Sequence, residues 1–350
     1  MKTVHINASK NYPVEIGTNL LSSLSQRIKA VSSAQKVAII SDSNVFPIYG
    51  ENIESQLKQD GFLVFRYVFP AGEESKNGCT YLAILNFLAE NALTRSDALI
   101  ALGGGVVGDM TGFVAATYLR GIAYIQIPTT VLAAVDSSVG GKTAIDLPAG
   151  KNLAGAFYQP NLVLCDIDLL DTLPHQIYTD GCAEVIKYGI LYDESLFSGL
   201  EDQGLSYDRE AVITRCVELK AQAVMQDEKD IGERQKLNLG HTVGHAIESC
   251  SGYCISHGQA VAAGTAIIAR AAAAHKICSI DCAARIEHLL TQFGLPTKTA
   301  FSAEELISRM LSDKKRAGSH INLILPTEIG SCIIHPIPVA ELKSFIEAGL

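Results

Sequence analysis

The stretch that most constrains the fold of this chain runs from Ala98 to Asp109. It begins with five consecutive apolar residues, 98–102, and passes directly into glycines at positions 103, 104, 105 and 108. A short continuous apolar run followed at once by glycines is typical of a buried parallel strand that ends in a tight turn and leads into a helix. The sequence therefore predicts a strand-turn-helix unit here, with a buried strand.

The glycines of this unit also suggest a ligand. Gly103, Gly105 and Gly108 have the spacing G-x-G-x-x-G, in which backbone without Cβ atoms approaches a pyrophosphate and helix N–H groups point at its charge. A Rossmann unit has an acid about 20 residues further on that binds the ribose. Here the next expected strand, 124–127, ends instead in Pro128-Thr129-Thr130. The motif indicates either a dinucleotide site of non-standard layout or a glycine-lined turn that binds nothing.

Strand-like and helix-like segments alternate through the first half of the chain. The expected strands are an opening pair, 36–42, 62–69, 98–102, 124–127 and 161–166, and the expected helices are 20–30, 51–59 and a segment with Tyr81, Leu82, Leu85 and Leu88 on one apolar side. Such alternation is typical of a parallel sheet with helices on both faces. We therefore expect residues 1–173 to form an α/β domain with a Rossmann-like parallel sheet.

From residue 174 onward the hydrophobic periodicity is helical. The expected helices lie near residue 184 and at 209–226, 241–249, 258–275, 281–293 and 303–311, with one hairpin around 326–330. Residues 174–350 are therefore predicted to form a mostly α-helical second domain. A cleft between two domains is the expected place for a ligand.

Composition narrows the classes of partner. The 350-residue chain carries 28 Lys and Arg against 37 Asp and Glu, a net charge of -9, so no broad basic face for nucleic acid is expected. The Ala-rich segment 260–274 is interrupted by Arg270, and we expect no membrane span. Nine cysteines without a C-x-x-C pair, and no apolar leader after Met1, predict a cytoplasmic protein with reduced thiols.

Three of the nine histidines lie close together in the sequence, at positions 241, 245 and 257. His241 and His245 are four residues apart in an expected helix, so their imidazoles share one face and suit a divalent metal, to which Glu184 adds a carboxylate. Two imidazoles and one carboxylate leave coordination positions open, which indicates a catalytic metal that takes a substrate oxygen. The alternative is that these are ordinary polar residues of helices, with His257 capping one of them.

Cations beside glycine turns or on the expected helices predict an anion pocket on this acidic protein. They are Arg120, Lys142, Lys151, Lys187, Lys220 and Arg234. Each one taken alone is better explained as solvated surface charge. Asp42 ends the expected strand 36–42, where a carboxylate binds ribose hydroxyls, although a turn or helix-cap aspartate is the simpler explanation.

The motifs as a set resemble the 3-dehydroquinate synthase family, which is a family of sugar phosphate cyclases. They are, in chain order, 103–109, 118–121, 127–130, 135–142, 150–152, 183–188, 238–245 and 256–258. The resemblance extends from about residue 42 to 313–315. Thr143-Ala144-Ile145-Asp146 replaces the family's usual Thr-Gly-Val-Asn, and Val243 stands where Phe is common. These departures bear on the shape of the pocket rather than on the class of protein.

The resemblance implies a lyase of the shikimate pathway, which leads to the aromatic amino acids. Its substrate would be a phosphorylated sugar acid, 3-deoxy-D-arabino-heptulosonate 7-phosphate, and its products 3-dehydroquinate and phosphate. It further implies NAD, zinc or cobalt, and a homodimer. NAD would be reduced and reoxidised within one turnover, with phosphate elimination between the two hydride transfers, and ring opening and an intramolecular aldol step would follow.

The resemblance also implies roles for individual residues. The metal ligands would be Glu184, His241 and His257, so that His245 would face the substrate; the spacing argument instead pairs His241 with His245. Substrate hydroxyls, carboxylate and the metal shell would be contacted by Asp136, Lys142, Asn152, Lys187, Lys220, Arg234 and Asn238. Phosphate or carboxylate would lie near Arg120, Lys151 and Lys314 or Lys315. NAD would be bound by Asp42, Asn44, Glu73, Lys76, Gly105, Val106, Val107, Gly108, Asp109, Thr129 and Thr130, together with Lys142 and Lys151.

Three other functions remain open on the sequence. A metal-dependent NAD alcohol or glycerol dehydrogenase would share the two-domain plan, but it needs no phosphate pocket, and the cations count against it. A nucleotide-sensing or metal-storage protein is poorly served by an open metal site surrounded by cations. Another sugar phosphate cyclase is the alternative that sequence separates least well, because the differences lie in few pocket residues.

Overall fold

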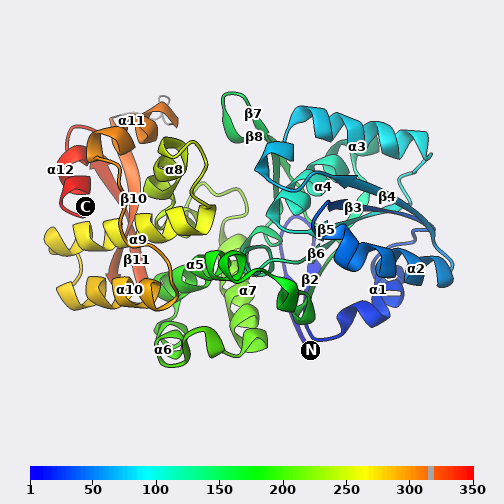
Figure 1. The fold of residues 1–350 in the computed structure, drawn as a ribbon, viewed down its shortest axis with the longest axis horizontal. Coiled ribbons are helices and arrows are strands. Elements are labelled where there is room, and N and C mark those ends of the chain that lie inside the picture. The colour runs from blue at the N-terminus through cyan, green and yellow to red at the C-terminus, as the bar shows by residue number, and fades with distance from the viewer. Residues whose placement is uncertain (314–318) are drawn as a thin grey trace. The chain divides into compact units, whose positions relative to one another are not determined.

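The computed structural model of the chain describes residues 1–313 and 319–350. These residues form two compact units, one made of Met1–Leu173 with Arg209–Lys229 and the other of Pro174–Asp208 with Asp230–Leu350 (Figure 1). Helix α7 (Arg209–Gln226), which the sequence analysis placed in the second domain, packs on β1 and β2 of the first unit. Helical periodicity predicted the helix itself, but it carries no information about which unit the helix joins.

A seven-stranded sheet, counted over the described residues, forms the centre of the first unit, in the order β1-β2-β9-β6-β5-β3-β4. Its strands are β1 (Lys2–Ile6), β2 (Tyr12–Gly17), β3 (Lys36–Asp42), β4 (Leu63–Phe69), β5 (Ala98–Gly103), β6 (Ala123–Pro128) and β9 (Leu162–Asp166). The first two strands pair antiparallel, and every other neighbouring pair is parallel. The predicted Rossmann-like parallel sheet is therefore confirmed.

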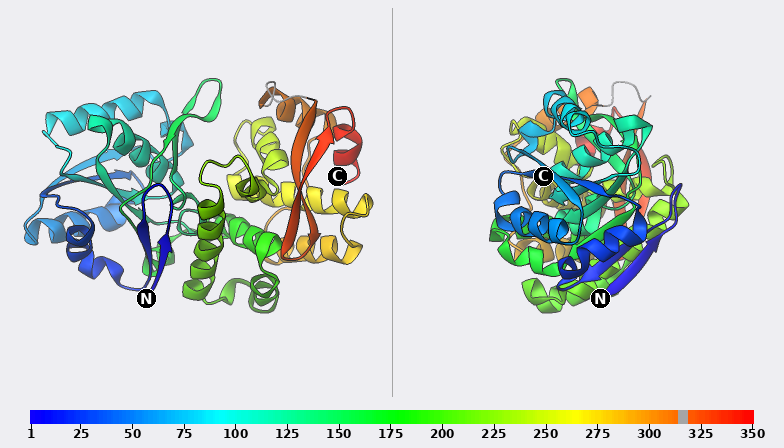
Figure 2. Two further views of the ribbon diagram at one scale, coloured as in Figure 1. Left: turned by 180° about the vertical axis from the view of Figure 1, so that it is seen from behind. Right: turned by 90° about the vertical axis from the view of Figure 1, so that its right-hand side faces the viewer.

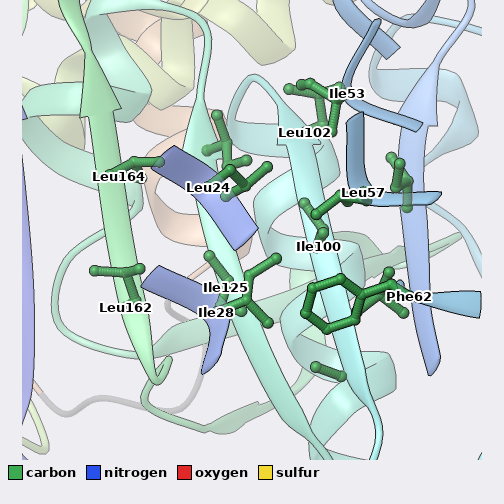
Figure 3. Close-up of a cluster of buried hydrophobic side chains, with 14 of the residues drawn as sticks. Leu24, Ile28, Ile53, Leu57, Phe62, Ile100, Leu102, Ile125, Leu162 and Leu164 are labelled. Carbon is green, nitrogen blue, oxygen red and sulfur yellow. The ribbon is translucent and has the colours of Figure 1, made fainter. Parts of the chain in front are cut away.

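Helices cover both faces of this sheet (Figure 1). One face packs against α1 (Leu24–Val31) and α2 (Glu51–Gln59), and the other against α3 (Gly78–Glu90) and α4 (Gly105–Thr117). Successive strand residues point to opposite faces, so β3, β5 and β6 supply apolar side chains to both cores. Figure 3 shows the first core, where side chains of α1 and α2 meet those of β5, β6 and β9.

Helix α3 buries the predicted apolar side except at one position, since Leu88 is buried and Tyr81 and Leu85 pack against the same core. Ile84 and Leu88 are buried against the sheet, whereas Leu82, expected on the apolar side, is 58% exposed. Because α3 is apolar on much of its circumference, the pattern alone did not fix the edge of its buried face.

The glycine turn between β5 and α4 has the predicted form. A Cβ atom at Gly103 would lie 2.5 Å from the Val107 side chain, and one at Gly108 would lie 2.7 Å from Oε1 of Gln126. The first contact is with a β-branched side chain close to its own backbone, which leaves no room for a Cβ atom, whereas the second is with the end of a flexible side chain, which can shift. The packing of the turn therefore requires glycine at position 103 and favours it at position 108.

An antiparallel hairpin also belongs to the first unit and was not expected. It consists of β7 (Lys142–Leu147) and β8 (Gly150–Phe157), which pair from Lys142 opposite Phe157 to Leu147 opposite Gly150. The hairpin places Lys151 and Asn152 beside its tip, and Asn152 has a positive φ of 55°. Three residues assigned to ligands thus lie on one ribbon.

The second unit is mainly helical, as predicted (Figures 1 and 2). Its elements are α5 (His175–Tyr192), α6 (Glu194–Gln203), α8 (His241–Cys250), α9 (His257–Ala274), α10 (Ile280–Gln292), α11 (Ala303–Asp313), α12 (Leu342–Glu347) and the hairpin of β10 (His320–Glu328) and β11 (Ser331–Pro338). Among the described residues, no helix combines the length and apolarity needed to cross a membrane.

Candidate active site

Three helices of the second unit meet at a cluster of one carboxylate and two imidazoles. Glu184 lies in the middle of α5, while His241 and His257 are the first residues of α8 and α9. Helices α8 and α9 approach backbone to backbone, because a Cβ atom at Gly264 would lie 2.3 Å from the carbonyl oxygen of Gly240. This contact holds the start of α8, where His241 lies, against the middle of α9, and the rings of His241 and His257 lie with their centroids 5.2 Å apart.

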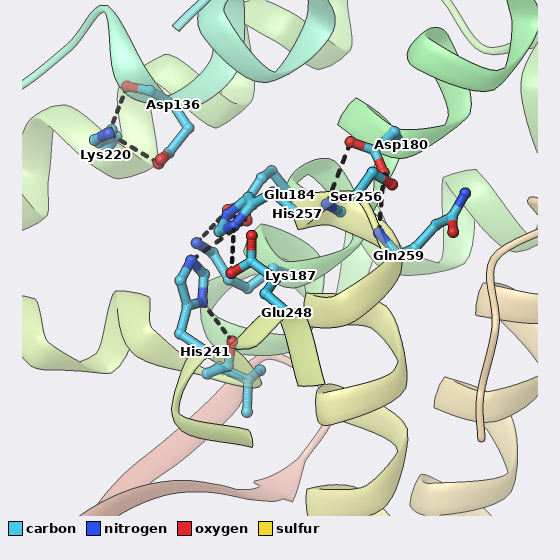
Figure 4. A network of polar contacts seen from close by, with 12 residues as sticks. Asp136, Asp180, Glu184, Lys187, Lys220, His241, Glu248, Ser256, His257 and Gln259 are labelled. Carbon is cyan, nitrogen blue, oxygen red and sulfur yellow. Dashed lines mark hydrogen bonds and ion pairs between the residues drawn. The ribbon is translucent and has the colours of Figure 1, made fainter. Parts of the chain in front are cut away.

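The cluster has the geometry of a ligand set. Nε2 of His241 lies 3.5 Å and Nε2 of His257 lies 3.6 Å from Oε1 of Glu184, whose side chain is 1% exposed (Figure 4). One ligand atom from each of these residues falls within 4.8 Å of the others. The two imidazole rings are tilted against each other, with centroids 5.2 Å apart. Both Nε2 atoms therefore face the same carboxylate oxygen.

The partners of the two Nδ1 atoms explain why each ring turns its Nε2 atom toward Glu184. Nδ1 of His241 lies 3.0 Å from the carbonyl oxygen of Leu239, and Nδ1 of His257 lies 3.6 Å from Oε2 of Glu248. From these neighbouring acceptors we assign the Nδ1–H tautomer to the neutral ring of His241, and to the ring of His257 in the metal-binding state, in which its Nε2 must have lost its proton. Metal-binding histidines characteristically donate their second N–H to a carbonyl or carboxylate in this way. A set of one carboxylate and two such imidazoles fits zinc or cobalt and leaves positions open.

Burial and neighbouring charges act differently on the two histidines. Burial, together with the Lys187 ammonium, lowers the pKa of His241 to about 3, so its imidazole is neutral at pH 7. Burial also disfavours charge on His257, but hydrogen bonding to Glu184 and Glu248 outweighs burial and raises its pKa to about 10. Lys187, itself buried, forms an ion pair with Glu184. Two buried carboxylates thus make this a site that favours cations.

A second candidate group overlaps the first. Ligand atoms of His245, Glu248 and His257 also fall within 4.8 Å of one another, although His245 is exposed. Neither group contains both His241 and His245, the pair favoured by helical spacing, even though their ring centroids are 5.4 Å apart. Sequence reasoning assigned Glu248 no role. Its position two helical turns after His241 was the available signal.

Several residues assigned to NAD or substrate form one polar network in the first unit. Lys76, 4% exposed, donates hydrogen bonds from Nζ to Oδ2 of Asp109 at 2.6 Å and to Oδ1 of Asn152 at 2.5 Å. The Glu73 carboxylate lies 4.0 Å from Nζ of Lys76 and 3.9 Å from Nζ of Lys151. Burial opposes the charge on Lys76, but Asp109 and Glu73 outweigh it and raise the Lys76 pKa. The glycine turn and the β7–β8 hairpin are thereby tied together.

Two further assigned carboxylates have hydrogen-bond partners within the first unit. Oδ1 of Asp42 accepts hydrogen bonds from the backbone N–H groups of Asn44 and Val45 at 2.8 and 2.9 Å, which is the turn-capping role given as the simpler explanation. Asp136 lies in the short helix η5 (Ala133–Ser137), and Lys220 of α7 donates to its carboxylate at 2.8 Å and to its carbonyl at 2.5 Å. A buried lysine on α7 is thus oriented by a residue distant in the sequence.

The remaining assigned residues are more scattered. Arg120 is exposed at the end of η4 (Tyr118–Arg120) with a φ of 66°, and its side chain makes no hydrogen bond or ion pair within the described part of the chain. Thr129 is buried, and Oγ1 of Thr130 accepts a hydrogen bond from the Ala133 N–H. Helix η8 (Glu233–Asn238) holds Arg234, which is buried, and Asn238, which is exposed. Lys314 and Lys315 lie outside the described residues.

The fold and the cluster place the chain in a class of proteins that combine a Rossmann-like α/β unit with a helical unit carrying a candidate metal site. A solved structure of 2-deoxy-scyllo-inosose synthase, complexed with carbaglucose-6-phosphate, NAD+ and Co2+, matches with a TM-score of 0.89 and 26% identity, covering 100% of both chains. The iron-containing alcohol dehydrogenase of Thermococcus thioreducens shares the fold, with a TM-score of 0.70 and 17% identity over 96% of this chain and 98% of that one.

Sequence comparison narrows the class to one family. Models of the N-terminal and C-terminal parts of 3-dehydroquinate synthase match residues 66–180 and 181–316. The 3-dehydroquinate synthase of Clostridium acetobutylicum is 42% identical over 353 residues, 99% of each chain, and that of Pelobacter propionicus is 43% identical over 351 residues, 98% of each chain. The chain belongs to the 3-dehydroquinate synthase family, which confirms the resemblance carried by its motifs.

Proposed function

We propose that this chain is a lyase that converts 3-deoxy-D-arabino-heptulosonate 7-phosphate to 3-dehydroquinate and phosphate, a step on the shikimate route to aromatic amino acids. The observation that carries the proposal is identity of 42% and 43% to two 3-dehydroquinate synthases over nearly the whole chain. The cluster of Glu184, His241 and His257 supports it independently, because an open site of this kind suits Lewis-acid chemistry on a substrate oxygen.

The proposal assigns NAD to the first unit and zinc or cobalt to the second. The network of Glu73, Lys76 and Asp109 at the glycine turn supports a nucleotide site there. The other residues assigned to NAD are Asp42, Asn44, 105–108, Thr129 and Thr130, with Lys142 and Lys151. Glu184, His241 and His257 would hold the metal. When bound, the two groups supply a reversible hydride acceptor and a Lewis acid for one substrate hydroxyl.

The chain's own side chains would bind and orient the anionic substrate. Lys187 and Lys220 are buried and already oriented, by Glu184 and by Asp136, so little ordering is required when a phosphate or carboxylate binds. His245 is exposed beside the metal candidates, which suits a residue that orients a substrate oxygen or moves a proton. The remaining substrate assignments are Arg120, Lys142, Lys151, Asn152, Arg234, Asn238 and Lys314.

The direct test is product analysis. The purified protein is incubated with the heptulosonate phosphate, NAD and zinc or cobalt, while phosphate, carbocyclic product and reduced NAD are measured. We expect phosphate and carbocycle in equal amounts without accumulation of reduced NAD, because NAD is restored within each turnover. Stoichiometric reduced NAD would move the assignment to a dehydrogenase. No turnover of this substrate, but turnover of another sugar phosphate, would indicate a different cyclase.

We further propose that the protein is a cytoplasmic homodimer. No disulfide joins any of the nine cysteines, all of which lie within the described residues, and this suits a reducing compartment. Light scattering of the purified protein measures the oligomeric state, and a monomeric mass at micromolar concentration would contradict the dimer. Cell fractionation tests the location.

A further inference from the structure

The N-terminus of α9, where His257 lies, is capped from another helix. Ser256 occupies the N-cap position, but within the described structure its side chain accepts no hydrogen bond from its own helix. Its hydroxyl instead donates to Oδ1 of Asp180 on α5. The same carboxylate accepts a hydrogen bond from the backbone N–H group of Gly258 at 3.2 Å. It accepts another from the backbone N–H group of Gln259 at 3.0 Å (Figure 4). Asp180 therefore accepts hydrogen bonds from the backbone N–H groups at the start of α9, which a serine N-cap ordinarily does for its own helix.

The joint between α5 and α9 is also sterically tight. A Cβ atom at Gly258 would lie 2.0 Å from the carbonyl oxygen of Asp180, so the two backbones touch at this point. Asp180 precedes Glu184 by four residues, which places both side chains on one face of α5. His257 immediately precedes Gly258. The contact between Gly258 and Asp180 therefore sets the position of His257 relative to Glu184, which lies one turn from Asp180 on α5.

We propose that Asp180 is a positioning residue for the metal site: by capping α9 from α5 it fixes the distance between Glu184 and His257 and thereby sets the affinity for the metal. The proposal rests on the metal site of the proposed function. Its physical reason is the narrow tolerance of metal coordination, since ligand distances must fall within about 0.2 Å of their ideal values. A favourable interaction of the carboxylate with the helix dipole adds to the cap.

Terminating α9 would not by itself require a hydrogen bond to α5. If Ser256 capped its own helix, α9 would be equally well terminated, but its first turn would have no hydrogen bond to α5. Three hydrogen bonds from α9 to a single carboxylate on α5 instead couple two helices that each carry one assigned ligand. The coupling predicts an effect on metal binding beyond the effect of a lost helix cap.

The test compares two cap removals in the full-length protein. Asp180→Ala removes the cap of α9, and Ser279→Ala removes the cap of α10, where the hydroxyl of Ser279 accepts from the Cys282 N–H at 3.0 Å. Helix α10 carries no assigned site residue. Cobalt and zinc affinities are measured by competition with a chromogenic chelator, the visible spectrum of bound Co²⁺ is recorded, and thermal unfolding is measured in the metal-free protein.

We expect Asp180→Ala to weaken metal binding by about 10- to 100-fold, the usual cost of removing a residue that orients a ligand, and to change the Co²⁺ spectrum. Ser279→Ala should leave affinity and spectrum at the parent values while lowering the unfolding temperature. Asp180→Asn, which keeps the shape and one acceptor oxygen, should fold if the alanine variant does not, and should lose less affinity.

Parent-like affinity and spectrum in both Asp180 variants would overturn the proposal, whatever happens to their thermal stability. Equal losses of affinity in the Asp180 and Ser279 variants would also overturn it, since the effect would then follow from helix capping in general. A parent protein that binds neither cobalt nor zinc would overturn the metal site of the proposed function and this inference with it. Metal binding that His257→Ala abolishes but the Asp180 variants retain would overturn this inference alone.

Discussion

Replacement of His241 and of His245, one at a time, separates the two candidate ligand groups. His257 belongs to both groups, so its removal does not discriminate between them. If the metal is bound beside Glu184, His241→Ala removes one of three protein ligands and His245→Ala removes none. If the metal is bound beside Glu248, the two variants exchange roles.

The expected magnitude follows from the number of ligands. Structural zinc sites with four protein ligands bind with apparent free energies of about 10–16 kcal/mol at pH 7, or roughly 2.5–4 kcal/mol per ligand. The side chain of His241 is 12% exposed, and its Nε2 lies 3.5 Å from Oε1 of Glu184, so little rearrangement is available to replace it. We therefore expect His241→Ala to weaken metal binding by about a hundred- to a thousandfold. His245→Ala should change it by less than about threefold while catalytic turnover falls.

Elemental analysis after dialysis against a weak chelator gives the retained metal, and chelator competition gives the affinity. Circular dichroism and the thermal midpoint of the metal-free variants control for loss of folding. Metal lost from the His245 variant and retained by the His241 variant would refute the assignment in favour of the group with Glu248. Metal lost equally from both would support the pair that helical spacing favours, and would refute the geometric reasoning from Nε2.

Three further outcomes test other parts of the structure. Lys76→Met should lower the free energy of unfolding by about 2–4 kcal/mol, because the mostly buried Asp109 loses its ion pair. Lys151→Met should lower it by less than about 1 kcal/mol, because the Lys151 side chain is 29% exposed. Equal urea midpoints for the two variants would show that the Lys76 pair contributes nothing. Gly240→Ala should cost about 2–4 kcal/mol, since φ is 75° and the new Cβ would lie 2.2 Å from Oγ1 of Thr265, and an unchanged urea midpoint would contradict the close helix approach. Removal of metal by a chelator should abolish turnover, with recovery on adding zinc or cobalt but not magnesium, and full activity of protein verified as metal-free would exclude a catalytic metal.

Local patterns in the sequence were sufficient for most elements of the fold. The apolar run 98–102 followed by glycines predicted β5, the turn and α4, because burial on both faces and the absence of Cβ atoms are properties of a few adjacent residues. Helical periodicity predicted both ends of each of α8 to α11 with no more than a two-residue error. The residue types of the metal cluster were also evident, since Glu184, His241 and His257 combine oxygen and nitrogen donors suited to a divalent ion.

Other features depended on contacts between segments far apart in the chain. The pattern of α3 showed apolar residues on much of its surface, so only its packing on the sheet decided that Leu82 is exposed while Ile84 is buried. The periodicity of α7 predicted a helix but could not show that it packs on β1 and β2. A helix pattern describes which residues are apolar, whereas the surface that covers them belongs to another part of the sequence.

In the metal cluster, too, the sequence shows which residues are present but not which of them meet. Spacing along α8 favoured His241 with His245, because residues four apart share a helix face whatever surrounds them. The structure instead directs the Nε2 atoms of His241 and His257 to one Glu184 oxygen, with Leu239 and Glu248 facing the opposite ring nitrogens. The sequence by itself determined which donors are available. Which of them face one another was decided only by the tertiary structure, because the orientation of an imidazole ring depends on packing and hydrogen bonds from helices that are separate in the chain.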